Sequence, residues 1–266
     1  MCLYGVEIMI YQGSKAQWAP LIWDFIIRAL QAHKIPYPDE KTYFVDAMCG
    51  GCGMTAYVPL KNRIANDING AIVAYHQRII EDTKWLLEPD LLLVTKERYY
   101  DIKDNVDRYS PAYRGFVGIN YSWGAGFFAG YKPNGTLQEV AKRAYKNAVK
   151  ESKKLKGVLF HNKDYRELYY PPHSIIYFDM PYRGTQGYKD ETGKTIAFDY
   201  DAFFDFIEHL YNEGHYVFFS EYDPELPEWA IRVGSFERPS KFGKKKESVL
   251  VLPEGNNNKI IEEVHE

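Results

Sequence analysis

The 266-residue sequence has few cysteines, no long apolar run and little net charge. Its three cysteines, Cys2, Cys49 and Cys52, are odd in number and lack the spacing of a disulfide framework, which favours a reducing, cytoplasmic compartment. No apolar run approaches the ~20 residues that span a bilayer, and we expect neither a membrane segment nor a signal peptide. Because the net charge is only -3, any surface that binds a polyanion must be a local basic one.

The remaining composition is that of an ordinary soluble globular protein. Apolar residues make up 45% of the chain and charged residues 26%. The length suffices for one large domain or for a domain with an insertion. The 23 tyrosines suit stacking surfaces, although they prove none.

A short segment with the pattern of a buried strand ends in a group of residues suited to an amine. The apolar, β-branched run Ser174–Phe178 predicts the strand. It is followed by Asp179, by Met180, which the next proline holds extended, and by Tyr182. Ligands of open α/β sheets bind beyond the carboxyl ends of strands. This group therefore suits a planar base with an exocyclic amino group, and the alternative is a strand exit with one solvated aspartate.

Two further strand ends carry acidic turns. The strand predicted over 42–47 leads into the glycine-rich turn of residues 46–53 and a helix from Met54, an arrangement that cradles nucleotide-like ligands. The spacing is not GxGxxG and no Lys-Ser/Thr follows, so the ligand need not carry phosphate. The next strand, Arg63–Asn66, ends at Asp67, before a helix over about 70–87. Asp67 is placed to hold ribose hydroxyls, or else caps that helix.

The Cys49-Gly50-Gly51-Cys52 sequence invites a zinc or a redox interpretation. Zinc needs a second pair of ligands, which the sequence lacks, and a thioredoxin-like motif opens a helix in a different context. Small thiols packed in a tight turn are favoured, and no metal is expected. Upstream, Ser14 is expected to cap a helix over Trp18–Leu30.

Residues 81–156 interrupt the alternation of helices and strands. Glycine and aromatic residues are concentrated in 113–133, and a helix expected over 143–156 carries Lys146, Lys150, Lys153 and Lys154. Aromatic residues interleaved with basic ones suit nucleic-acid contact, but a solvated helix beside an aromatic packing layer explains them equally well.

The alternation then resumes. Val158–Phe160 is expected to be a return strand, after which Asp164 can accept from a ligand amine. A helix over Tyr200–Asn212 and a strand over Tyr216–Ser220 follow. Arg238–Lys246 is expected to be a basic loop before a final strand, Ser248–Leu252.

Several of these segments resemble, in order, the motifs of the Dam-like N6-adenine DNA methyltransferases. The resemblance covers most of the chain, from Tyr11 to about Leu252, and the matching segments are 11–15, 44–53, 66–69, 128–133 and 243–250. The sequence departs from the family's Asp-Pro-Pro-Tyr motif in having Met180 as its second residue. The role implied for that position is a main-chain carbonyl acceptor, which any residue supplies.

The resemblance implies an α/β, Rossmann-like S-adenosylmethionine-dependent methyltransferase fold with a largely parallel sheet. Residues 1–80 and 157–266 would form the catalytic domain, and 81–156 an inserted target-recognition region. The function implied is transfer of a methyl group from S-adenosylmethionine to adenine N6 in double-stranded DNA, with base flipping, as in restriction-modification systems. The oligomeric state is not predicted.

The resemblance also implies roles for individual residues. The catalytic residues would be Asp179, Met180, Pro181 and Tyr182. The cofactor-binding residues would be Tyr11, Gly13, Ser14, Lys15, Asp46, Ala47, Met48, Cys49, Gly50, Gly51, Gly53, Asp67, Ile68 and Asp164. The DNA-binding residues would be Tyr113, Arg114, Trp123, Tyr131, Lys132, Lys241, Lys244, Lys245 and Lys246.

The implied chemistry makes the amino group of adenine a better nucleophile. Asp179 and the Met180 carbonyl would accept its two N–H bonds, and the Tyr182 ring, rather than its hydroxyl, would stack on the flipped base. Rival hypotheses are methylation of another planar amine, in RNA or on a glutamine side chain, and a catalytically silent DNA-binding protein, suggested by Met180. A dinucleotide oxidoreductase is disfavoured by the glycine spacing.

Overall fold

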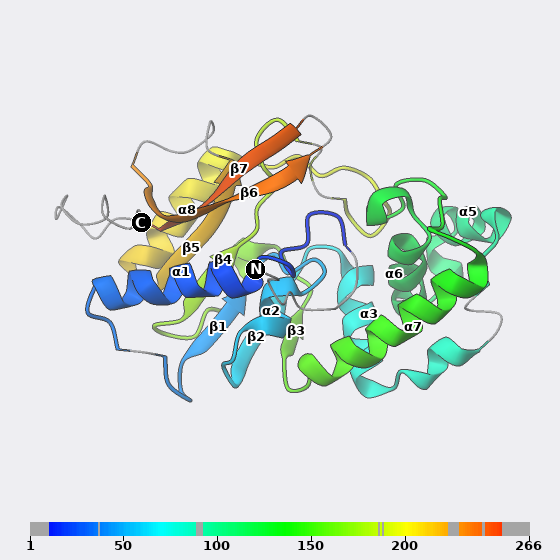
Figure 1. Cartoon of the computed structure of the whole chain (residues 1–266), viewed down its shortest axis with the longest axis horizontal. Coiled ribbons are helices and arrows are strands. Elements are labelled where there is room, and N and C mark those ends of the chain that lie inside the picture. Colours follow the sequence, from blue (N-terminus) through cyan, green and yellow to red (C-terminus); the bar gives the residue numbers. More distant parts are fainter. Residues whose placement is uncertain are drawn as a thin grey trace.

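The computed structural model describes residues 11–36, 38–88, 93–185, 187, 189–222, 229–240 and 243–251. Its centre is a seven-stranded sheet with the order β3-β2-β1-β4-β5-β7-β6 (Figure 1). The strands are β1 (Tyr43–Asp46), β2 (Asn62–Asn66), β3 (Leu159–His161), β4 (Ile175–Phe178), β5 (Tyr216–Tyr222), β6 (Ile231–Ser240) and β7 (Gly243–Val251). The first five are parallel, whereas β7 runs antiparallel to both β5 and β6.

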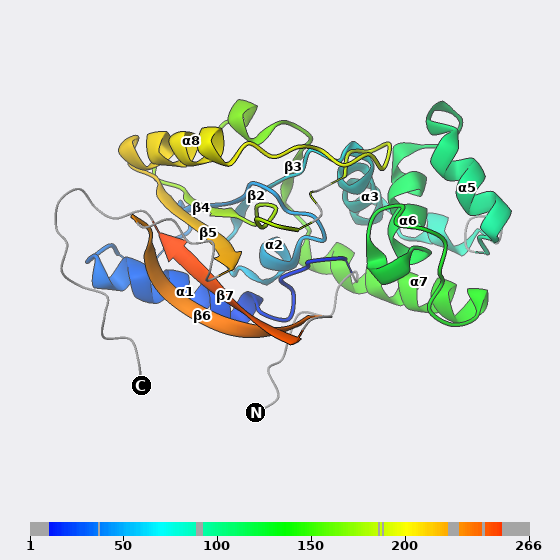
Figure 2. The ribbon, with the colours of Figure 1, turned by 90° about the horizontal axis from the view of Figure 1, so that it is seen from above.

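Helices cover both faces of the sheet. They are α1 (Ala19–Ala32), α2 (Gly53–Tyr57), α3 (Gly70–Glu81), α5 (Lys96–Asp104), α6 (Pro111–Asn120), α7 (Leu137–Lys154) and α8 (Tyr200–Asn212). Short 3-10 helices are η1 (Lys84–Leu87), η2 (Val106–Arg108), η3 (Trp123–Ala125) and η4 (Tyr165–Glu167). Figure 2 shows α1 and α8 on opposite sides of the sheet, so the fold is a three-layer α/β/α arrangement.

The alternation of side chains along the central strands builds these layers. Phe44, Tyr177 and Phe218 pack on the α1 side, whereas their neighbours Val45 and Phe178 pack on the α8 side. Because both faces are covered, β4 is buried along its whole length and reads as a continuous apolar run. The mixed, mostly parallel sheet with helices on both faces confirms the predicted Rossmann-like fold.

A group of helices lies beyond the β3 edge of the sheet. Figure 1 shows α5, α6 and α7 gathered beside α3. One hydrophobic core joins α3 to the following segments, with Tyr75, Phe116 and Ala144 as members from three helices. At Gly115 a Cβ atom would lie 2.2 Å from the Ala71 carbonyl oxygen, so α6 approaches α3 too closely for any side chain there. The region proposed for target recognition therefore shares its core with α3.

Most predicted elements are present with shifts of one to a few residues at their ends, but three expectations are wrong. The segment predicted as a basic loop, Arg238–Lys246, lies largely in the antiparallel hairpin of β6 and β7. Ser14 does not cap α1: its hydroxyl accepts from the Ala16 amide, and the helix begins at Ala19 after Trp18. The helix expected over about 70–87 stops at Glu81, because Asp82 is extended.

Candidate functional site

The strand order reverses between β1 and β4, the position at which open α/β sheets bind ligands. A pocket lies there, beyond the carboxyl ends of these two strands. It is lined by Tyr11, Gln12, Gly13, Ser14, Lys15, Asp46, Met48, Cys49, Gly50, Gly51, Gly53, Met54, Tyr177 and Asp179. The N-terminal segment, the glycine-rich turn and the end of β4 are thus brought together as the sequence predicted.

The backbone of the glycine-rich turn is held by neighbouring segments. The Cys49 amide donates to the Asn66 carbonyl at 2.8 Å, and the Gly50 amide donates to the Asp67 carboxylate at 2.8 Å. Buried His76 lies 2.8 Å from the Gly50 carbonyl oxygen through Nε2. At Gly50, where φ is +44°, a Cβ atom would lie 2.8 Å from the Tyr11 ring. The turn therefore needs glycine both for its backbone conformation and for contact with the N-terminal segment.

Two aspartates at the strand ends are occupied by internal hydrogen bonds. Asp67 accepts from the amides of Gly50 and Asn69, each at 2.8 Å, so it joins the turn to the start of α3. Asp46 accepts from the amide and hydroxyl of Thr55 and is only 2% exposed. Burial raises the pKa of both carboxyl groups, that of Asp46 to about 8. At neutral pH this shift favours the protonated form of Asp46.

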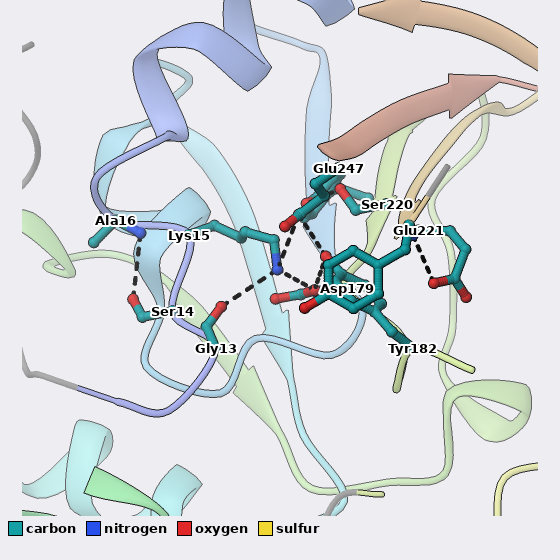
Figure 3. Close-up of polar contacts among 11 residues, drawn as sticks. Gly13, Ser14, Lys15, Ala16, Asp179, Tyr182, Ser220, Glu221 and Glu247 are labelled. Atoms are coloured by element: carbon teal, nitrogen blue, oxygen red, sulfur yellow. Dashed lines mark hydrogen bonds and ion pairs between the residues drawn. The ribbon is translucent and has the colours of Figure 1, made fainter. Parts of the chain in front are cut away.

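Figure 3 shows a charged cluster at the end of β4. Lys15 Nζ lies 2.5 Å from Asp179 Oδ1 and 3.4 Å from Glu247 Oε1. It also donates to the Gly13 carbonyl at 3.3 Å, and it lies 4.9 Å from the centre of the Tyr182 ring. The lysine is 3% exposed and Glu247 is fully buried, whereas the Asp179 side chain keeps 15% of its surface.

Tyr182 differs from the sequence-based expectation that only its ring is used. Its hydroxyl lies 2.5 Å from Glu247 Oε1 and 3.3 Å from Asp179 Oδ1, and the residue is only 7% exposed. Burial and the two carboxylates raise its pKa well above the usual value, so the hydroxyl keeps its proton and donates it. Its ring meets that of Tyr222 edge-on, with centroids 4.6 Å apart. The phenol is thus part of the charged cluster.

Four of the predicted DNA-binding residues lie in the helical region as two pairs, one buried and one exposed. Tyr113 and Arg114 are 4% and 1% exposed, and the Arg114 guanidinium donates to the carbonyls of Ile102 and Glu191. In this conformation they support the helical region from inside, contrary to the expectation of surface contacts. Trp123 and Lys132, by contrast, are exposed and line an open groove together with Arg143.

The other predicted residues are more dispersed. Asp164 lies outside the pocket, where it pairs with Arg166 at 2.7 Å and caps η4. Tyr131 donates to the Val94 carbonyl, while Ile68 is 43% exposed beside Asp67. Lys246 is exposed on β7; Lys241 and the side chains of Lys244 and Lys245 lie outside the described part of the structure.

Sequence reasoning missed several residues of the site. Gln12, Met54 and Tyr177 line the pocket although no role was predicted for them individually, and Gln12 lies within the resembling segment 11–15. Glu247 lies within the resembling segment 243–250, but the sequence predicted no role for it. Its position beside Lys15 depends on how β7 pairs with β5. Cys49 and Cys52 are free and buried, as expected for packed thiols.

Neither a metal site nor a membrane helix is found in the described residues. No cluster of three or more His, Cys, Asp or Glu side chains among them is arranged to hold a metal ion. None of the helices described is long and apolar enough to cross a membrane.

A mostly parallel α/β sheet with a glycine-rich turn at its switch point and Asp-Met-Pro-Tyr after β4 defines a Rossmann-like methyltransferase. The chain matches the family of D12 class N6 adenine-specific DNA methyltransferases over residues 11–232. Since this match covers more than half of the chain, the protein belongs to that family and is an enzyme that methylates adenine N6 in DNA. The comparison with curated proteins finds no match.

Proposed function

We propose that the pocket between β1 and β4 binds S-adenosylmethionine and that Asp179, Met180 and Tyr182 receive the target adenine beside it. One observation carries this proposal: Asp179 lines the same pocket as the glycine-rich turn. An amine bound to its carboxylate therefore lies next to whatever occupies the turn. Methyl transfer needs this proximity, because the nitrogen must approach the methyl group in line.

The residues of the pocket fit the cofactor. S-adenosylmethionine supplies an electrophilic methyl group on a positively charged sulfonium, and the pocket offers the Asp179 carboxylate and the glycine-rich turn rather than a phosphate cradle. Asp67 is the candidate for the ribose hydroxyls, since its oxygens can accept further bonds beside those from Gly50 and Asn69. Ile68 presents an exposed apolar side chain beside it. Asp164 would have to release Arg166 to take part.

The proposed chemistry rests on two acceptors at the end of β4. Asp179 and the carbonyl of Met180 accept the two N–H bonds of the amino group and favour a pyramidal nitrogen. Pro181 restrains Met180, whose side chain is buried. A methionine supplies the same carbonyl as the proline that it replaces. The substitution therefore leaves both acceptors in place.

The proposed DNA surface lies on the helical region and the β6–β7 hairpin. Trp123, Lys132 and Arg143 line one open groove, and Lys246 is exposed on the hairpin. A cationic side chain beside an exposed indole suits phosphate contact together with base stacking. The adenine must leave the duplex to reach Asp179, at a cost of a few kcal/mol. Tyr113 and Arg114 are buried and lie outside this surface.

Methyl transfer to three substrates tests the proposal. The purified chain with S-adenosylmethionine should form N6-methyladenine in plasmid DNA, and little product in RNA or on protein. Asp179→Asn should lose this activity. Asp39→Asn, an exposed residue before the amino end of β1, is the control and should keep it. DNA binding without methyl incorporation would instead support the catalytically silent alternative, and product confined to RNA or glutamine would overturn the DNA assignment.

A further inference from the structure

The buried carboxylate of Glu247 lies against the proposed reaction centre. It comes from β7, where it is paired with Tyr222 of β5 and Phe236 of β6. Figure 3 shows its side chain directed at Lys15 and Tyr182. The side chain is fully buried, and a buried carboxylate is costly unless it is paired and hydrogen-bonded. Lys15 and the Tyr182 hydroxyl provide these interactions.

The cluster contains one ammonium group and two carboxylates. Lys15 Nζ is closer to Asp179, at 2.5 Å, than to Glu247, at 3.4 Å. Its third contact is the Gly13 carbonyl at 3.3 Å, so the lysine donates hydrogen bonds to Asp179 and Gly13 and has Glu247 as a second ion-pair partner. The excess negative charge complements a cationic cofactor.

Asp179 has to serve three donors if it also binds the amino group of adenine. The same oxygen, Oδ1, is within reach of the Lys15 ammonium and of the Tyr182 hydroxyl. A tight ion pair with Lys15 makes Asp179 a weaker acceptor for the adenine N–H group, because both donors compete for the same carboxylate. A second acceptor for Lys15 removes this competition without leaving a buried ammonium unpaired.

We propose that Glu247 is a positioning residue for methyl transfer: it accepts the Lys15 ammonium when the amino group of adenine occupies Asp179, and it holds Tyr182 through the phenolic hydroxyl. This inference rests on the proposed function of Asp179. Glu247 itself touches neither substrate nor cofactor in the proposal. It acts through two side chains that line the reaction centre.

The neighbouring strand provides a matched control. Glu221 on β5 is also fully buried, but its carboxylate accepts from the backbone amides of Arg183 and Tyr222. Glu221→Gln removes the same charge from the same part of the sheet. A loss of activity that arises only from buried-charge removal would be shared by the Glu221 and Glu247 variants.

The test separates the methyl-transfer step from binding. Single-turnover methylation of plasmid DNA is measured at saturating S-adenosylmethionine, together with the Kd of cofactor and of DNA. Glu247→Gln should slow the single-turnover rate by about tenfold or more, the scale expected when a charged hydrogen-bond partner is removed. Both Kd values should stay within about threefold of the wild type. Glu221→Gln should keep the rate even if it lowers the Tm.

Double-variant cycles decide whether Glu247 acts through its two neighbours. Its effect should be smaller in Tyr182→Phe and Lys15→Met backgrounds than in the wild type, because each removes part of the interaction. Tyr182→Phe alone should slow transfer, and it keeps the inference testable if Glu247→Gln does not fold. A wild-type rate in folded Glu247→Gln or in Tyr182→Phe would overturn the inference about Glu247. Equal losses of rate in the Glu221 and Glu247 variants would also overturn it. None of these outcomes would affect the proposed function. Absence of methyl transfer by the wild-type chain would overturn the proposed function with it.

Discussion

The buried carboxyl group of Asp46 predicts a specific dependence of stability on pH. Asp46 is 2% exposed, and its Oδ2 accepts from the Thr55 hydroxyl at 2.7 Å and amide at 3.2 Å. Burial raises its pKa from 3.8 to about 8, Cys52 adds to the increase, and the bonds from Thr55 oppose it. In the unfolded chain the same group ionises near its ordinary value. The folded protein therefore holds a proton that the unfolded chain has released.

The sign and size follow from proton linkage. A carboxyl group whose pKa is raised by folding stabilises the folded state below its unfolded pKa, and this contribution is lost as pH rises towards the folded pKa. For Asp46 the interval runs from about pH 4 to about 8. One group gives a slope of about 1.4 kcal/mol per pH unit. Between pH 6 and pH 8 the free energy of unfolding should therefore fall by roughly 2 kcal/mol on account of this residue.

Asp46→Asn isolates this contribution, because asparagine cannot ionise and keeps an acceptor oxygen for Thr55. Urea unfolding of both proteins at pH 6, 7 and 8 gives the difference in unfolding free energy at each pH. That difference should shift by roughly 2 kcal/mol in favour of the variant across the series. Asp39→Asn is the control: hydrogen bonds from the Lys41 amide and Thr42 lower the pKa of this exposed aspartate, so its titration lies at acidic pH. Parallel pH profiles for Asp46→Asn and the wild type would refute the argument.

Three further expectations concern the site itself. Asp67→Ala should weaken cofactor binding by about 1–3 kcal/mol and lower the Tm, because the Gly50 amide loses its acceptor; unchanged affinity in calorimetry of a folded variant would contradict the ribose assignment. Tyr182→Ala should reduce the extruded population of a 2-aminopurine target by about ten- to a hundredfold in fluorescence, since the stacking lost is roughly 1–3 kcal/mol. If Tyr182→Ala methylates as fast as Tyr182→Phe, the ring is not the platform and Trp123 becomes the candidate. Lys132→Ala should weaken DNA binding for all sequences alike and reduce the slope of log affinity against log salt by about 1, and an unchanged slope would exclude a phosphate contact.

The sequence was sufficient to predict the central strands, because their apolar runs are bounded by clear stops. Pro172 and Pro181 bracket β4, and its predicted and observed ends differ by one residue. The helix predicted over Tyr200–Asn212 is α8 with the same bounds, since Asp199 caps it through the Ala202 amide. Local signals of this kind need no knowledge of the tertiary fold.

Most of the β6–β7 hairpin was missed, although the end of β7 was predicted as the strand Ser248–Leu252, because the rest of its sequence has no strand pattern. Lysines at 244–246 interrupt the alternation that predicts a half-buried strand, and Pro239 argues against regular pairing. In the structure this segment pairs across the turn of the β6–β7 hairpin, and only the following residues of β7, Glu247–Val251, pair with β5. No local window of sequence shows either pairing. The same limit explains Arg114: its charge suggested a nucleic-acid contact, but the carbonyls that bind it come from residues 102 and 191.

In the candidate site too, the sequence predicts where the acidic residues lie but not which side chains pair with them. Strand ends placed Asp46, Asp67 and Asp179 near one another, since the carboxyl ends of parallel strands meet at one edge of the sheet. Which of them is paired is a separate question, because the partners come from elsewhere in the chain. Lys15 arrives from the N-terminal segment and Glu247 from the antiparallel β7. A candidate catalytic carboxylate can therefore be located by its strand, whereas its charged neighbours come from two segments that only the fold brings to it.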